Sequence, residues 1–193
     1  MPTTHKVIYE TADKVSTPVF NPTRTLQWIG GVSGGILADL TDRIQTLMIE
    51  NPMETINLVV TSHGGPTGIG MSFYDTMRSV YRPNLCTIGS GDVDSSGIIV
   101  FLAGNERYIT PNTTLLLHLA GRVFDTPKRF TTPEMESIVK EDKLKDFQYA
   151  SVIADRSEGK LTVQEVLDLM AHNTVLTPSE AVELGIAHSI LNT

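Results

Sequence analysis

Cysteine and positive charge are both scarce in this sequence. The 193 residues include a single cysteine, Cys86, so the chain cannot form an internal disulfide, and its place in an apolar run predicts a buried strand residue. The 15 lysines and arginines are outnumbered by 22 acidic residues, which gives a net charge of −7, and no basic run is long enough to follow a phosphate backbone. We therefore expect no nucleic-acid partner.

Long hydrophobic runs are also missing. No apolar stretch approaches the roughly 20 residues that a membrane span requires, and residues 1–6 lack the charged and apolar regions of a signal peptide. We expect no membrane partner, and the single cysteine fits a reducing cytoplasm, where we place the protein.

Metal-binding and nucleotide-binding patterns are missing as well. Four of the five histidines lack the spacing of metal ligands, and each is expected to be structural or solvated: His5, His63, His172 and His188. No glycine-rich loop with a phosphate-binding lysine occurs. The sequence therefore predicts neither a metal site nor a bound cofactor.

The chain reads as an N-terminal arm, residues 1–24, followed by one domain, residues 25–193. Strand-like runs alternate with turns and helical patterns, which is typical of an α/β fold with a parallel sheet. Function in such sheets collects at the carboxyl ends of the strands. Strands are expected near 26–29, 56–61, 85–88, 108–109, 114–118 and 186–191, with tight turns at 62–66 and 89–94.

An unusually long helix is expected at about 132–155. Thr132 is its predicted N-cap, Pro133 suits the first helical position, and Glu134 favours the positive end of the helix dipole. Two shorter helices are predicted to follow, each opening with a capping box, at 162–165 and at 177–180.

Ser95 is the candidate nucleophile. It follows a strand, lies in a turn of small residues, and directly precedes an apolar helix whose first backbone N–H groups are free. An oxyanion formed there would meet the Ser96 N–H, and Gly64-Gly65 exposes a second stretch of backbone after the neighbouring strand. The competing interpretation is that Ser95 merely turns the chain and caps the helix, and position alone does not separate the two.

His118 is the candidate general base. It is the histidine that directly ends an apolar strand, residues 114–118, so it can face the same rim of the sheet as Ser95. A half-buried structural histidine is the alternative interpretation, and the position of His118 alone slightly favours it.

Several motifs, in order and at similar spacing, resemble the family of ClpP, the proteolytic subunit of the Clp protease. The resemblance runs from about residue 25 to the end and is carried by Gly64-Gly65 with Gly70–Met77, by Asp94–Gly97, by Ala103-Gly104, Pro111-Asn112 and Leu116–His118, and by Thr177–Ala181 with Leu184–Ile186. It implies a ClpP/crotonase-like spiral of ββα units, from which the long helix at 132–155 projects as a handle.

The resemblance also implies residue roles. Ser95 is expected to be the nucleophile, His118 the general base and Asn173 the third member of the triad, while Gly65 and Ser96 supply the oxyanion-hole amides. The expected enzyme is an ATP-dependent serine endopeptidase made of two stacked heptameric rings, of this chain alone or mixed with a second ClpP-type subunit. An AAA+ unfoldase is expected to feed it unfolded polypeptides and to use the ATP.

Three departures from the family pattern bear on activity. Counting back without gaps from Gly185 places Asn173 where the family has an aspartate, and the nearby Asp168 could replace it only through a shift of register. Asp92 and Asp94 stand beside the nucleophile where the family has small neutral residues; alternatively, both face solvent and favour the following helix. Residues 119–123 also differ from the family's substrate-binding segment.

These departures leave two further hypotheses open. The chain could be a weakly active or inactive ClpP paralogue that serves as a structural ring subunit. It could also be a crotonase-like acyl-CoA enzyme, which uses backbone amides as an oxyanion hole but does not need Ser95 and His118 together.

Overall fold

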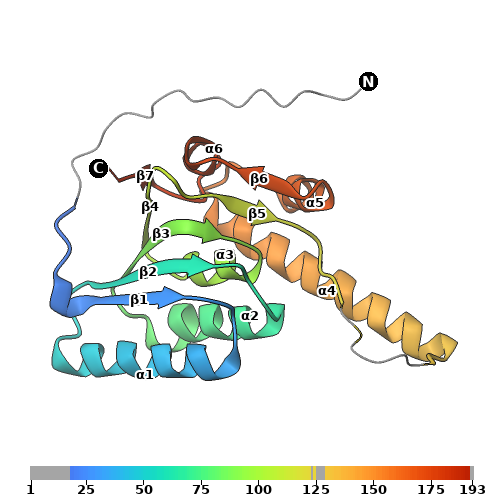
Figure 1. Ribbon diagram of the computed structural model, residues 1–193, viewed down its shortest axis with the longest axis horizontal. Helices are drawn as coiled ribbons and strands as arrows, with labels where there is room; N and C mark the ends of the chain where they lie inside the picture. The colour runs from blue at the N-terminus through green and yellow to red at the C-terminus, as the bar shows by residue number, and fades with distance from the viewer. Residues whose placement is uncertain (1–17, 123, 125–128, 192–193) are drawn as a thin grey trace.

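The structure is a computed structural model that describes residues 18–122, 124 and 129–191. Its main sheet is parallel throughout, in the order β1-β2-β3-β4-β7, and a small antiparallel sheet pairs β5 with β6 (Figure 1). The strands are β1 (Thr25–Ile29), β2 (Ile56–Ser62), β3 (Leu85–Val93), β4 (Glu106–Ile109), β5 (Leu115–Leu117), β6 (Thr174–Leu176) and β7 (Ser189–Ile190).

From β1 to β4 the strands alternate with helices along the chain, as the α/β prediction requires. In Figure 1, α1 and α2 run along one side, while α5 and α6 lie with the small sheet at the opposite end. The helices are α1 (Gly34–Glu50), α2 (Thr67–Asp75), α3 (Ser96–Phe101), α4 (Thr132–Arg156), α5 (Val163–Ala171) and α6 (Pro178–Glu183), with a 3-10 turn η1 (Pro22–Arg24) and a π-helical segment η2 (Thr76–Tyr81).

The central strands of the sheet contribute much of the core. Leu58 and Val60 of β2 are completely buried on one face of the sheet, while β1 alternates between buried and exposed residues. Cys86 of β3 is 1% exposed, which confirms the predicted buried strand residue, and burial raises the pKa of its thiol to about 12.

The expected arm lies mostly outside the described residues, which begin at position 18. Its last residue, Arg24, is buried, and its guanidinium donates hydrogen bonds to the carbonyls of Leu47 in α1 and of Asn51 and Glu54 after α1. The chain therefore joins the body of the domain at η1, just before β1.

The turn predicted at residues 89–94 is wrong, because β3 continues through it. Val93 pairs with Ser62 of β2, and the Thr61 hydroxyl donates a 2.6 Å hydrogen bond to the Ser90 carbonyl. A register shift between Val60 and Ser62 takes up the additional residues. The strand thus carries the chain to the point where the nucleophile turn begins.

Helix α4 projects from the body as the predicted handle (Figure 1). Within the described part of the chain, its buried side chains lie at the inner end: Tyr149, Ala150 and Ile153. Its N-cap is Thr131 rather than the predicted Thr132, because the Glu134 carboxylate reaches back to the Thr131 N–H at 2.8 Å and closes a capping box one residue earlier. Among the described helices, none is both long and apolar enough to cross a membrane.

Candidate active site

Ser95 has a backbone conformation that L-residues rarely adopt, with φ 54° and ψ −133°. It stands at the N-cap position of α3, yet its side chain makes no capping hydrogen bond, and its hydroxyl has no hydrogen-bond partner among the described residues. The capping interpretation is therefore wrong. A strained serine between a strand and a helix, with its hydroxyl unbonded, is the arrangement expected of a nucleophile elbow.

Contacts from three elements hold this strained residue. The Ser95 N–H donates to the Leu116 carbonyl at 2.9 Å, while the Ser95 carbonyl accepts from the Ile98 N–H at 2.9 Å and from the Tyr149 hydroxyl at 2.8 Å. Tyr149 is buried on α4, so its hydroxyl reaches the nucleophile turn from within the core. Sequence analysis missed Tyr149, because nothing in a helical pattern distinguishes a tyrosine that reaches a distant turn.

The predicted oxyanion-hole residues lie on two turns that are tied together. The Ser96 hydroxyl donates a 2.9 Å hydrogen bond to the Gly65 carbonyl. In the part of the chain that the structure describes, the N–H groups of Gly65 and Ser96 have no acceptor, so both remain available to a ligand. A side chain at Gly65 would collide with the Val32 carbonyl, which explains why the closest approach of these segments requires glycine there.

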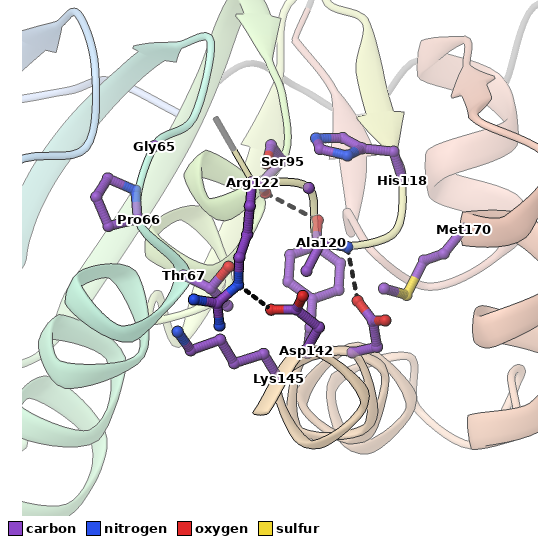
Figure 2. A pocket seen from close by; sticks show the side chains of 13 residues that line it. Gly65, Pro66, Thr67, Ser95, His118, Ala120, Arg122, Asp142, Lys145 and Met170 are labelled. Carbon is purple, nitrogen blue, oxygen red and sulfur yellow. Dashed lines mark hydrogen bonds and ion pairs between the residues drawn. The ribbon is translucent and has the colours of Figure 1, made fainter. Parts of the chain in front are cut away.

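Ser95 and His118 line one cavity of about 340 Å³, together with Gly65 (Figure 2). The partly buried His118 follows β5, and its ring extends toward the side of the cavity that holds Ser95. No hydrogen bond joins the two side chains among the described residues. The structure thus brings the predicted nucleophile and the predicted base to the same cavity.

The hydrogen bond of His118 assigns the tautomer of its ring. Its Nδ1 lies 2.7 Å from the Leu119 carbonyl oxygen, and because a carbonyl can only accept, Nδ1 must carry the proton. In the neutral ring Nε2 is then unprotonated and able to accept a proton. A general base that acts on a serine hydroxyl needs this tautomer.

Asn173 lies next to His118 by register but does not touch its ring. Leu117 of β5 pairs with Thr174 of β6, so the next antiparallel position outward juxtaposes the backbones of His118 and Asn173. The Asn173 side chain is exposed, makes no hydrogen bond to His118, and is not among the described residues that line the cavity. Asp168 is exposed on α5, and its carboxylate accepts a 2.9 Å hydrogen bond from Gln164.

The two aspartates of the nucleophile turn differ from each other. Asp92 is exposed and accepts only a long, 3.4 Å hydrogen bond from the Thr114 hydroxyl. Asp94 is half-buried, and its Oδ1 accepts a 2.9 Å hydrogen bond from the Leu116 N–H. Burial raises the pKa of Asp94, and the Leu116 hydrogen bond opposes this shift. The interpretation that both carboxylates face solvent is therefore wrong for Asp94.

The segment after His118 is fastened to the middle of α4 largely by charged groups. The Ala120 N–H donates to Asp146 at 2.7 Å and the Arg122 guanidinium donates to Asp142 at 2.8 Å (Figure 2). Arg122 also bonds Glu141 at 2.6 Å. Hydrogen bonds from Lys145 and Arg122 lower the pKa of Glu141 to about 2, so this carboxylate stays charged. Within the described residues, no group of three or more acidic, histidine or cysteine side chains could hold a metal ion.

The fold and this cavity define a serine-hydrolase type of site on a parallel α/β scaffold, and comparison with known proteins identifies the family. A model of the Clp protease family matches residues 10–193. The ATP-dependent Clp protease proteolytic subunit 2 of Tropheryma whipplei (strain Twist) is 30% identical over 166 residues, which are 84% of this chain and 88% of that protein. The chain therefore belongs to the Clp protease family and is a ClpP-type proteolytic subunit.

A solved structure supports the fold. An asparagine-to-aspartate mutant of ClpP1 from Listeria monocytogenes superimposes with a TM-score of 0.77 at 22% sequence identity, covering 89% of this chain and 92% of that one. The predicted ClpP-like architecture is confirmed by this likeness, while the roles of the individual site residues rest on the geometry described above.

Proposed function

We propose that this chain is the peptidase subunit of an ATP-dependent Clp-type serine endopeptidase, with Ser95 as the nucleophile and His118 as the general base. The observation that carries the proposal is the strained Ser95, whose unbonded hydroxyl shares a cavity with a histidine in the required tautomer. Strain of this kind persists only where the surrounding structure holds it, and it is concentrated at functional sites.

In the proposed reaction, the Ser95 hydroxyl attacks the carbonyl carbon of the scissile peptide while His118 Nε2 takes its proton. The tetrahedral intermediate then collapses, the carbon–nitrogen bond breaks, and His118 returns the proton to the leaving amine. A water molecule, deprotonated by the same nitrogen, hydrolyses the acyl ester on Ser95. The products are the two peptides and the free serine.

The oxyanion of each tetrahedral intermediate is held by the N–H groups of Gly65 and Ser96. Their lack of an internal acceptor supports this role, because a preorganised donor costs no rearrangement when charge develops. Because Gly65 has no side chain, its turn packs closely against Val32, and this contact helps to fix the position of the Gly65 amide.

Asn173 is proposed as the third member of the triad, which orients His118 through Nδ1. Its support is the register of β5 and β6, which brings its backbone beside that of His118. In the present conformation the Leu119 carbonyl holds the Nδ1 proton instead. An asparagine orients the ring without adding charge, so it stabilises the imidazolium less than an aspartate does.

The working enzyme is proposed to be a barrel of two stacked heptameric rings, of this chain alone or mixed with a second ClpP-type subunit. The outer half of α4, which projects from the body, supports this, because three of its apolar side chains are not covered by the described residues: Met135, Val139 and Leu144 are 46%, 48% and 52% exposed. The mass of the assembly measured by sedimentation decides between a heptamer, a tetradecamer and a monomer.

Unfolded polypeptides are the proposed substrate, and an AAA+ unfoldase in the cytoplasm is the proposed partner that supplies them. The unfoldase uses the ATP, and this chain is proposed to need no cofactor of its own. The name of the Tropheryma whipplei relative, which describes an ATP-dependent protease, supports this arrangement.

The proposal is tested by covalent labelling of the assembled protein with a fluorophosphonate, followed by mass spectrometry of the modified peptide. We expect one adduct, on Ser95, and none in the Ser95→Ala variant. Ser79→Ala, which changes an exposed serine away from the cavity, is the matched control and should be labelled at the wild-type rate.

Absence of any adduct, with the unfoldase and any partner subunit present, would refute the enzymatic proposal and support the inactive paralogue. An adduct at another residue would refute Ser95 as the nucleophile. Binding of an acyl-CoA thioester, measured by calorimetry, would support the crotonase-like hypothesis instead.

A further inference from the structure

The nucleophile turn and the strand that carries His118 are joined by a parallel ladder of hydrogen bonds. Thr114 donates its N–H to the Gly91 carbonyl at 3.0 Å and accepts from the Val93 N–H at 2.9 Å, which bridges it to Asp92. Parallel pairing repeats this pattern two residues further on. The next bridge would join Asp94 with Leu116.

That next bridge is present, but one of its acceptors is a side chain. The Ser95 N–H donates to the Leu116 carbonyl at 2.9 Å, as the ladder requires. The Leu116 N–H should then donate to the Val93 carbonyl, yet it donates to Asp94 Oδ1 at 2.9 Å. The chain leaves the strand direction at Ser95, where φ becomes positive, and the carboxylate of Asp94 occupies the acceptor position.

The location of this bond links it to catalysis. Asp94 is adjacent to Ser95 along one strand, and Leu116 lies two residues before His118 along the other. Both polar backbone groups of Leu116 are bonded to the pair Asp94 and Ser95, so the bridge sets how far His118 stands from Ser95.

The surroundings of Asp94 agree with a structural bond rather than a solvated surface charge. Burial is the largest influence on its pKa, which is raised, and the nearby Asp92 adds to the effect. The Leu116 hydrogen bond opposes it, as do the nearby His118 and His63. The carboxylate is therefore held at the site by a specific partner.

We propose that Asp94 is a positioning residue, whose carboxylate completes the ladder between β3 and β5 in place of a backbone carbonyl and thereby sets the approach of His118 to Ser95. The inference rests on the proposed roles of these two residues, and it assigns a function to a carboxylate that the proposed mechanism does not use.

Two substitutions separate the acceptor from the charge. Asp94→Ala removes the acceptor, whereas Asp94→Asn keeps an amide oxygen in the same place without the charge. Because a small misplacement of catalytic groups can cost about a hundredfold, we expect Asp94→Ala to lower kcat by about 10- to 100-fold and to leave KM within about twofold. Asp94→Asn should stay within about threefold of the wild-type kcat.

The measurements are steady-state hydrolysis of a fluorogenic peptide by the assembled protein and hydrogen exchange of the Leu116 amide. Exchange at Leu116 should be at least about tenfold faster in Asp94→Ala than in Asp94→Asn, because only the alanine leaves the N–H unbonded. Asp92→Ala is the matched control: it removes an exposed carboxylate with one long hydrogen bond, and both readouts should stay at wild-type values.

The inference is overturned if Asp94→Ala retains the wild-type kcat, if Asp94→Asn is as impaired as Asp94→Ala, or if Leu116 exchange does not change. A wild-type protein that no fluorophosphonate labels refutes Ser95 as the nucleophile, and the catalytic part of this inference with it. Labelling of the wild type combined with an unimpaired Asp94→Ala refutes the inference alone.

Discussion

The two halves of the active site are built in different ways. The nucleophile half consists of the ends of β2 and β3 and the start of α3, where Ser96 is 1% exposed and the turn is bonded to backbone and to the buried Tyr149. The histidine half consists of residues 118–122 and Asn173, where Arg122 bonds the carboxylates of Glu141 and Asp142 on α4. The first half is held by contacts with buried residues, and the second largely by charged groups near the surface.

This difference shows which half of the site is held more firmly. A strained serine costs free energy and needs surrounding contacts that leave it no alternative, and the core provides them. Exposed ion pairs such as those of Arg122 add little to stability and weaken with salt. We therefore expect the ion pairs of Arg122 to hold the histidine half less firmly than the buried contacts hold Ser95.

The largest effect is expected from Gly65→Ala, which disrupts the nucleophile half of the active site. A methyl group at this position would collide with the Val32 carbonyl and displace the proposed oxyanion donor. Loss of one such donor typically lowers kcat by about 100- to 1,000-fold, and we expect a decrease of this size in peptide hydrolysis.

Gly68→Ala is the matched control for this change, since a methyl group there meets nothing within 4 Å. It should retain the wild-type kcat. A Gly65→Ala variant with unchanged kcat would show that the Gly65 amide does not hold the oxyanion.

An intermediate effect is expected from Asn173→Asp, which changes the histidine half of the active site. A carboxylate beside His118 stabilises the imidazolium that forms when the ring takes the serine proton, so kcat should rise by about tenfold. The measurement is peptide hydrolysis at saturating substrate by the assembled protein.

Asp168→Asn serves as the comparison, because it changes the other nearby carboxylate, which is exposed on α5. Its kcat should equal that of the wild type. If Asn173→Asp has no effect, Asn173 is not the orienting residue, and the Leu119 carbonyl that already holds Nδ1 performs this task.

The smallest effect is expected from Tyr149→Phe, which removes one bond between α4 and the nucleophile turn. The Ser95 carbonyl keeps its bond from the Ile98 N–H, so no buried group is left unpaired. We expect a loss of about 1 kcal/mol in the free energy of unfolding, measured with denaturant, and at most about a fivefold lower kcat.

Tyr74→Phe is the control, since the hydroxyl of this half-buried tyrosine has no hydrogen-bond partner among the described residues. It should change neither quantity. Equal losses in the two variants would mean that the Tyr149 hydroxyl does not support the turn.

Much of the architecture could be predicted from local patterns. The capping boxes at Thr162 and Thr177 are present, Ser33 caps α1, and apolar runs mark β2 and the first part of β3. Strand β6 was missed, because three residues that pair only with β5 carry no alternating pattern of their own. The end of β3 was missed for a related reason, since its glycines and serine resemble a turn and become strand only through pairing with β2.

The sequence by itself determined the α/β class, the place of Ser95 before α3 and the presence of His118 at a strand end, because these follow from the order of residue types along the chain. Only the tertiary structure decided that Ser95 is strained and its hydroxyl unbonded, that the His118 ring is held by Leu119, and that Asp94 bonds the opposite strand. Hydrogen bonds between segments 22 or 54 residues apart depend on how the strands and α4 pack, which no local pattern specifies.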